Sequence, residues 1–341
     1  MKKALLLLVI ALYGTVAIAQ TLTSKLDEFL SVLQRTNKFN GVALVAKDGK
    51  ILLNKGYGWR DAHKRVLHDE HSIFQIGSIT KQFTATVVLY LQEQGKLRVS
   101  DTIGKYVPGF PNGGRITIEH LLTHTSGIYS YTNDSRFMNV QAVKPIALDS
   151  LINIFRNKPL DFQPGAQYRY NNSGYILLGY IIQKVSGKPY EQMVRELIFR
   201  PAGMQHSGFD FKGLKAPERS TGYFALAYDT IRSTLVDSSV SYAAGSIYAT
   251  AEDLYKWSKA LLADKVIKRS SINKAFTPYK NNYGYGWAID SLEGKRIIEH
   301  NGGIFGFTSD MLWVPADGVC IVLLSNKPEM LGPITKTLFR I

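Results

Sequence analysis

Strand-type and helix-type patterns occupy different parts of this 341-residue chain. Near the start, the stretch "GVALVAKDGKILLNKGYG" has two β-rich runs on either side of Asp48-Gly49, a dipeptide typical of a two-residue hairpin turn. Strand-type runs return only near the end of the chain, in "YGYGWAID", "KRIIEH", "TSDMLWVP" and "GVCIVLLSN". We therefore expect an α+β fold whose antiparallel sheet takes strands from both ends of the chain.

Helices are expected at both ends of the chain and between the two sets of strands. Apolar residues at helical spacing predict a helix in Ser24–Arg35, and "PITKTLFRI" predicts a short last helix. Between about Ile79 and Ala263 the pattern is mostly helical, with loops that contain Pro and Gly. The helices predicted there are Ile79–Gln94, Ile118–Leu122, Tyr175–Val185 and one with Thr250 as its N-cap.

These patterns predict a sheet flanked by N- and C-terminal helices, with a large, mostly helical insertion. With 45% hydrophobic residues, the chain can bury a large core. We expect one domain of residues 20–341, with an α/β part at about 20–75 and 265–341 and a helical part at about 76–264.

The first twenty residues, "MKKALLLLVIALYGTVAIAQ", have the three features of a secretory signal. These features are a basic start, an apolar run and a small-x-small end at Ala17-Ile18-Ala19. We expect residues 1–19 to be a signal peptide and the mature protein to work in the periplasm or cell envelope. The alternative is a retained membrane anchor, although the apolar run is near the short limit for spanning a bilayer. No cysteine follows the run, so no lipid anchor is expected.

Composition excludes several other classes of protein. The single cysteine, Cys320, leaves no internal disulfide and no cysteine-built zinc site. His120 and His124 are four residues apart, but "HLLTH" lacks the glutamate of a zinc-protease helix and no third ligand is evident, so no metal is expected. We expect His124 to bond within its own loop. The formal charge of +14 comes from scattered residues, so we expect a solvated basic surface and no nucleic-acid partner.

A serine nucleophile has one good candidate. The chain has no G-x-S-x-G, which excludes the nucleophile elbow of the α/β-hydrolases. Ser78-Ile79-Thr80-Lys81 follows Gly77 and begins a helical pattern with a buried stripe, so the lysine lies over the serine hydroxyl. Either a buried lysine or a tyrosine perturbed by it would take the serine proton. The motif alone leaves open an N-cap with a surface lysine, and Ser271-x-x-Lys274 matches it too.

A Tyr-x-Asn triplet supplies a second element. It occurs at Tyr131, Tyr170 and Tyr279, but only Tyr170-Asn171-Asn172 directly precedes a long amphipathic helix. Tyr170 could relay the proton, and the Asn172 amide could bind a substrate carbonyl and the lysine. Tyr131 is expected in an exposed loop as a further contact in the cleft.

The third element is His300-Asn301-Gly302-Gly303, which follows a strand-type run. Small residues after the histidine would let a substrate backbone lie along the strand edge. A backbone N–H near Gly303, with that of Ser78, would form an oxyanion hole, and each donor contributes about 3 kcal/mol in the transition state.

Taken in this order, the three elements resemble the serine β-lactamase and penicillin-binding-protein superfamily, specifically its class C β-lactamase-related branch. That branch includes D-alanyl-D-alanine peptidases, D-aminopeptidases and esterases. The resemblance spans essentially the whole mature chain and includes "LLTHTSGI", "YNNSGYILLGYIIQKVSG", "AAGSIYATAEDLYKW" and "VLLSN". It implies a β-lactamase/transpeptidase-like fold and an acyl-enzyme on Ser78, with Lys81 and Tyr170 moving the proton and Asn172 orienting substrate. It also implies that the His300 strand lines the cleft between the two parts, and that no cofactor is needed.

One departure from the family bears on substrate. Class C β-lactamases usually have Lys-Thr-Gly where this chain has His300-Asn301-Gly302. A lysine there is a permanent cation for the substrate carboxylate, whereas a histidine with an unperturbed pKa near 6.5 is mostly neutral at pH 7.5. We therefore expect a peptidase- or esterase-like hydrolase of small-molecule or peptide-like substrates, such as cell-wall fragments, with weak β-lactamase activity at most. The alternatives are a penicillin- or peptidoglycan-binding module with little turnover, and an envelope protein bound through its basic surface.

Overall fold

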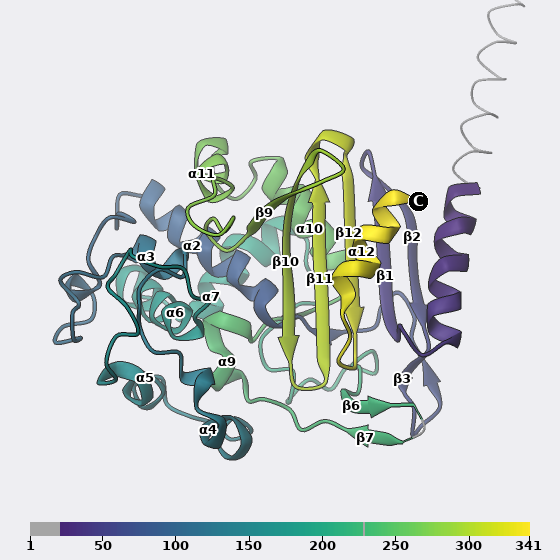
Figure 1. Ribbon diagram of the computed structural model, residues 1–341, viewed down its shortest axis with the longest axis horizontal. Coiled ribbons are helices and arrows are strands. Elements are labelled where there is room, and N and C mark those ends of the chain that lie inside the picture. The colour runs from purple at the N-terminus through teal and green to yellow at the C-terminus, as the bar shows by residue number, and fades with distance from the viewer. Residues whose placement is uncertain (1–20, 228) are drawn as a thin grey trace, which may run out of the picture.

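The computed structural model describes residues 21–227 and 229–341, so the predicted signal peptide lies outside the described residues. A six-stranded antiparallel sheet has the order β2-β1-β12-β11-β10-β9 (Figure 1). Its strands are β1 (Gly41–Lys47), β2 (Lys50–Tyr57), β9 (Ala288–Leu292), β10 (Lys295–Ile304), β11 (Phe307–Val314) and β12 (Val319–Ser325). The two ends of the chain meet where β1 pairs with β12, from Gly41 opposite Ser325 to Lys47 opposite Val319. The predicted α+β fold with a sheet built from both ends is confirmed.

The hairpin between β1 and β2 turns at the predicted dipeptide. Asp48 has a φ of 49° and Gly49 a φ of 79°, so both are left-handed. Two consecutive left-handed residues are what a type I′ turn requires, and its twist matches that of the flanking strands. The local sequence is therefore sufficient to specify this connection.

Both faces of the sheet are buried, in two separate cores. On β1, Val42 and Leu44 belong to the core shared with the helical part, while Ala43 and Val45 belong to the core on the opposite face. The helix at residues 21–35 and α12 (Leu331–Arg340) cover that opposite face. On the other face, α10 (Ala251–Leu262) packs against β1 and β12. Burial on both faces explains why the central strands are continuous apolar runs.

The remaining helices gather mainly on one side of the sheet (Figure 1). They are α2 (Thr80–Glu93), α3 (Ile118–Leu122), α4 (Ser135–Val140), α5 (Leu148–Arg156), α6 (Asn172–Ser186), α7 (Tyr190–Val194), α8 (Arg200–Ala202), α9 (Ser238–Gly245) and α11 (Arg269–Ala275). Helix α2 packs against α6, α7 and α9, which makes it the centre of the helical part. Thr250 caps α10 as predicted, accepting a hydrogen bond from Asp253 N–H at 3.1 Å. In the part of the chain that the structure describes, no helix is both long and apolar enough to cross a membrane.

Short elements complete the fold. Three small sheets pair β3 (Trp59–Asp61) with β4 (Val66–Leu67), β5 (Phe74–Gln75) with β8 (Tyr248–Ala249), and β6 (Tyr223–Leu226) with β7 (Thr230–Arg232). Short 3-10 or π turns are η1 (Gly77–Ile79), η2 (Ile103–Lys105), η3 (Tyr131–Asn133), η4 (Arg195–Phe199) and η5 (Pro315–Asp317). Of these, η1 is directly continuous with α2 and packs against β10 and β11.

Glycine allows β10 to lie directly against the turn that carries Ser78. A Cβ atom on Gly302 would be 2.1 Å from the carbonyl oxygen of Ile76, and one on Gly77 would be 2.9 Å from Gly303 N. Gly77 also has a φ of 50°, a conformation that L side chains rarely adopt. A Cβ on Gly303, in contrast, would meet nothing within 4 Å.

The two adjacent glycines should therefore respond differently to the same substitution. We expect Gly302→Ala to lower the free energy of unfolding by about 3 kcal/mol, because the backbone contact must open. Gly303→Ala should change it by no more than about 0.5 kcal/mol. Urea denaturation of both variants measures the difference, and equal stabilities would contradict the close contact.

Candidate active site

Ser78 and Lys81 form a buried pair at the start of α2. Ser78 lies in η1, and Lys81, which is 0% exposed, places Nζ 3.0 Å from Ser78 Oγ. Ser78 makes no side-chain cap to the helix, so the structure rules out an N-cap with a surface lysine. At the second match, Ser271 bonds to Glu93 and Lys274 is an exposed lysine near Glu119. Only the first match brings serine and lysine together.

Two carbonyl oxygens occupy the other hydrogen-bonding positions of Lys81. Its Nζ donates to Asn172 Oδ1 at 2.9 Å and to the carbonyl oxygen of Ala244 at 2.8 Å. Burial lowers the pKa of Lys81 well below its ordinary value, and no described carboxylate forms an ion pair with it. A neutral amine has two N–H donors and one lone pair. Because the two carbonyls take the donors, the lone pair is left for the Ser78 hydroxyl proton.

The Ala244 carbonyl is available because α9 is interrupted. Tyr242 has a φ of 36° and a ψ of −130° inside this helix, a conformation that costs energy for a non-glycine residue. The two carbonyls that follow turn toward α2, where Ala243 accepts from the Thr84 hydroxyl at 2.7 Å and Ala244 accepts from Lys81. This contact was not predictable from the sequence, since backbone strain leaves no local signal in "SYAAG".

Tyr170 lies beside the pair and keeps its proton. Its ring centroid is 4.8 Å from Lys81 Nζ. Although Tyr170 is 38% exposed, desolvation by the groups around it raises its pKa above the ordinary value, and a hydrogen bond with Ser78 offsets only part of this shift. A phenol that holds its proton cannot be the first base. Of the two bases that the sequence left open, the geometry favours Lys81, with Tyr170 as the relay.

Asn172 connects Lys81 to the wall of the helical part. Its Oδ1 accepts from Lys81, and its Nδ2 donates to Thr132 Oγ1 at 3.1 Å. The predicted contact between Asn172 and Lys81 is present, while contact with substrate stays a prediction. Thr132 was missed, although it lies in another of the Tyr-x-Asn triplets. Tyr131 was wrongly expected to be exposed: it is 2% exposed, because its hydroxyl donates to the Val240 carbonyl at 2.8 Å.

His300 is buried and neutral. It is 4% exposed, with Nδ1 2.6 Å from the Asn301 carbonyl oxygen and Nε2 2.8 Å from the Tyr283 hydroxyl. Burial lowers the pKa of His300 to about 3. Both ring nitrogens are engaged, so the ring cannot serve as a cation for a carboxylate. Asn301 is exposed beside it.

The edge of β10 is open where the sequence predicted it. This strand pairs with β9 only from Lys295 to Glu299, so the segment from His300 to Ile304 has no partner strand on that side among the described residues. The contact between Gly77 and Gly303 brings the strand against the turn of Ser78. The backbone N–H groups of Ser78 and Gly303 are therefore near one another, and their role as an oxyanion hole stays a prediction.

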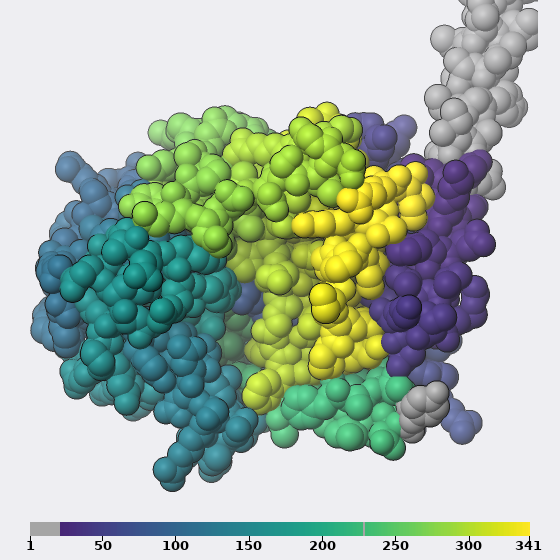
Figure 2. Space-filling view, viewed as in Figure 1, coloured from purple at the N-terminus to yellow at the C-terminus, as the bar shows by residue number. Residues whose placement is uncertain are grey.

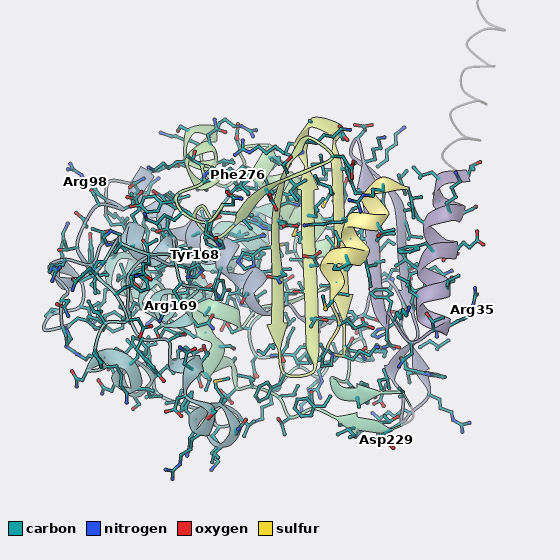
Figure 3. All side chains as sticks on the ribbon, viewed as in Figure 1. Arg35, Arg98, Tyr168, Arg169, Asp229 and Phe276 are labelled. Atoms are coloured by element: carbon teal, nitrogen blue, oxygen red, sulfur yellow. The ribbon has the colours of Figure 1, made fainter. Side chains whose placement is uncertain are left out.

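Two hollows lie next to the candidate site, and Figure 2 shows the surface hollowed between the helical part and the sheet. The apolar hollow, of about 430 Å³, includes Ser78, and its apolar lining residues include Met138, Val236, Val240, Phe305 and Phe307. The polar hollow, of about 540 Å³, is lined by residues that include Tyr170, Tyr283, His300, Asn301, Glu299, Asp310 and Lys336. The two share Gly303 and Thr308. Tyr168 and Arg169, labelled in Figure 3, mark the loop that carries Tyr170.

His124 was expected to bond within its own loop, but it bonds to the loop that carries Tyr170 instead. Its carbonyl oxygen accepts from Arg169 N–H at 2.9 Å, and its Nδ1 accepts from Asn171 N–H at 3.1 Å. His120 belongs to the capping box of α3 instead, where its Nδ1 accepts from Thr117 N–H. Within residues 21–227 and 229–341, no group of three or more His, Cys, Asp or Glu side chains could hold a metal ion.

Comparison with known proteins identifies the family. The family model described as Beta-lactamase matches residues 26–337. The chain belongs to the beta-lactamase family. It is 36% identical over 306 residues to PbpX of Bacillus subtilis (strain 168), named as a penicillin-binding protein, covering 89% of this chain and 75% of that protein. A penicillin binding protein from Bacillus halodurans has 28% identity and a TM-score of 0.81, covering 91% of this chain and 98% of the other.

A second solved structure broadens the chemistry of the family. A D-stereospecific amidohydrolase from Streptomyces sp. has 27% identity and a TM-score of 0.73, covering 84% of this chain and 89% of the other. The family and these neighbours support a serine hydrolase related to the β-lactamases. The predicted recognition of the serine β-lactamase and penicillin-binding-protein superfamily is confirmed.

The pH dependence of acylation should report Lys81. The rate should rise with pH through the pKa of Lys81, since only the neutral amine can accept the serine proton, and level off well below pH 10.5. His300 titrates near 3, so it contributes nothing between pH 5 and 9. His300→Gln should therefore leave the midpoint of the acid limb in place, whatever it does to the rate. Stopped-flow measurement of the acylation rate across this pH range gives the midpoint. A midpoint that shifts in His300→Gln would contradict the assignment of the acid limb to Lys81.

Proposed function

We propose that this protein is an exported serine hydrolase of the class C β-lactamase-related type, acting through a Ser78 acyl-enzyme on amide or ester substrates. The observation that carries the proposal is the Lys81 amine. It is fully buried, lacks a carboxylate partner among the described residues, and has its free hydrogen-bonding position at Ser78 Oγ. Export through the predicted signal peptide, with cleavage after Ala19, places the mature protein in the periplasm or cell envelope.

Each step of the proposed reaction uses a group in the cleft. Lys81 takes the proton from Ser78 Oγ as the oxygen attacks the substrate carbonyl. The negative charge that develops on the carbonyl oxygen is received by the N–H groups of Ser78 and Gly303. The tetrahedral intermediate collapses when the leaving group receives a proton from Tyr170, which recovers one from Lys81. Water then attacks the ester carbonyl while Lys81 takes one of the protons of that water. This proton passes to Ser78 Oγ as the ester bond breaks, and the acid is released.

The position of Tyr170 distinguishes the two hollows. Tyr170 lines the polar hollow, and the apolar hollow lacks it. Because the leaving group must lie beside the acid that protonates it, we assign the leaving group to the polar hollow and the acyl group to the apolar one. The preferred substrates are then amides or esters with an apolar or aromatic acyl group.

The charges in the polar hollow argue against a carboxylate-bearing leaving side. Lys336 is the cationic side chain among the described residues that line it, and its Nζ faces Glu299 at 3.9 Å. Nearby Asp310 is buried, and burial raises its pKa to about 7. With His300 neutral as well, the described residues that line the polar hollow supply no unpaired cation for the carboxylate of a β-lactam. This supports peptidase- or esterase-like activity on substrates whose leaving group carries no free carboxylate, including cell-wall fragments of that kind, with β-lactamase activity weak.

A penicillin- or peptidoglycan-binding module with little turnover is the second candidate, favoured by the names of the relatives. The complete set of Ser78, Lys81 and Tyr170 argues against it. A module that only binds has no physical need for a base and a proton relay next to its serine.

Intact-mass spectrometry separates the two candidates. We expect a phenylacetyl ester to acylate Ser78 and be turned over, and Ser78→Ala to form no adduct. A penicillin and a D-alanyl dipeptide mimic complete the panel. A stable penicillin adduct with no turnover of any substrate would favour the binding module. The acyl-enzyme proposal fails if no substrate gives either an adduct or turnover.

The apolar hollow predicts a preference that can be tested at Phe305. Removing its ring should lower kcat/KM for a phenylacetyl ester by about tenfold, because an apolar contact of about 1.5 kcal/mol is lost. The acetyl ester of the same alcohol is the internal control, since it does not reach the ring. Steady-state kinetics of Phe305→Ala with both esters measures the ratio, and an equal loss on both would contradict the acyl assignment.

A further inference from the structure

The loop that carries Tyr170 has no helix or strand of its own, so contacts from elsewhere must hold the tyrosine beside Lys81. His124 supplies two of them. Its carbonyl oxygen binds Arg169 N–H and its Nδ1 binds Asn171 N–H, which are the backbone groups on either side of Tyr170. One residue thus fixes the chain both before and after the tyrosine.

The imidazole also packs against the aromatic rings around the site. Its centroid is 4.2 Å from that of Tyr170 and 4.7 Å from that of Tyr283, and His124 is 1% exposed. The Tyr283 hydroxyl in turn contacts His300. The position of the Tyr170 ring therefore depends on His124 through both the backbone and the side chain.

The backbone conformation of His124 is one that favours glycine, which indicates that the histidine side chain has a role at this position. His124 follows Thr123, the C-cap of α3, and has a φ of 58°. Glycine or asparagine usually occupies this left-handed position after a helix, and other residues pay about 1 kcal/mol or more there. Glycine would remove the strain but could not accept the hydrogen bond from Asn171.

The hydrogen bond also fixes the protonation of the ring. A backbone N–H can only donate, so Nδ1 must accept and the ring proton lies on Nε2. Burial lowers the pKa of His124 well below its ordinary value. The acceptor at Nδ1 is therefore kept across the neutral pH range.

We propose that His124 is the positioning residue of Tyr170, holding the phenol where it can protonate the leaving group. The proposal rests on the proposed function, because it assigns His124 a role in acyl-enzyme formation. The positioning role goes beyond the proposed function, because it makes the acylation rate depend on a residue that touches neither Ser78 nor substrate. It also explains why histidine occupies a position that favours glycine.

Two variants that both tolerate a positive φ provide a matched test. His124→Asn keeps an acceptor, because Oδ1 takes the place of Nδ1, whereas His124→Gly has none. Thr117→Ala is the stability control, since it removes the N-cap of the same helix without touching the Tyr170 loop. Acylation rates are measured for two substrates with the same acyl group, an anilide and a 4-nitrophenyl ester, with thermal melting of each variant.

The leaving group is the diagnostic feature. An anilide must be protonated to leave, whereas 4-nitrophenolate leaves unaided. His124→Gly should therefore slow acylation by the anilide about 100-fold and by the ester less than about threefold, in the range expected for loss of a general acid. His124→Asn should recover most of the anilide rate, and Thr117→Ala should leave the ratio of the two rates as in the wild type.

The outcomes separate this inference from the proposed function. If His124→Gly keeps the wild-type ratio of the anilide rate to the ester rate, the positioning role is overturned while the acyl-enzyme proposal stands. Equal rates of acylation by the anilide in His124→Gly and His124→Asn would also overturn the positioning role. If the wild-type protein gives no Ser78-dependent acylation with either substrate, the proposed function fails and this inference fails with it.

Discussion

The site is organised around one buried amine that has no counter-ion in the described part of the chain. Lys81 Nζ contacts Ser78 from the turn before α2, Asn172 from the start of α6 and the carbonyl of Ala244 from the interrupted helix α9. A charge there would have to be removed from water at large cost, so the neutral form is favoured. Three elements that are distant in sequence must converge on a single nitrogen, and the packing of α2 against α6 and α9 meets that requirement.

A second constraint is the close approach of two backbones. Ser78 must face the open edge of β10, and this requires glycine at Gly302 and at Gly77. The same contact joins the helical part to a sheet whose strands come from both ends of the chain. The cleft therefore lies at the boundary between segments that meet only in the folded protein, and its two hollows differ in polarity because different elements line them.

Much of this arrangement was predictable from the sequence. The Asp48-Gly49 turn, helix α3 and the Thr250 cap follow from local propensities, and the structure has them where the sequence predicted. The serine and lysine followed from their spacing on one helix. The contacts of Thr132, Ala244 and Tyr283 were not predictable, because each depends on a long-range contact or on backbone strain. For the same reason, the sequence wrongly predicted that His124 bonds within its own loop and not to the loop that carries Tyr170.

The sequence by itself determined which residues could do the chemistry, because helical spacing and turn type are local properties of the chain. It predicted a serine nucleophile with its neighbouring lysine, the tyrosine before a long helix, and the glycine-rich strand. Only the tertiary structure decided how these groups behave. Desolvation in the folded protein lowers the pKa of Lys81 and of His300 and raises the pKa of Tyr170, since a pKa depends on the solvent and the partners that surround the folded group.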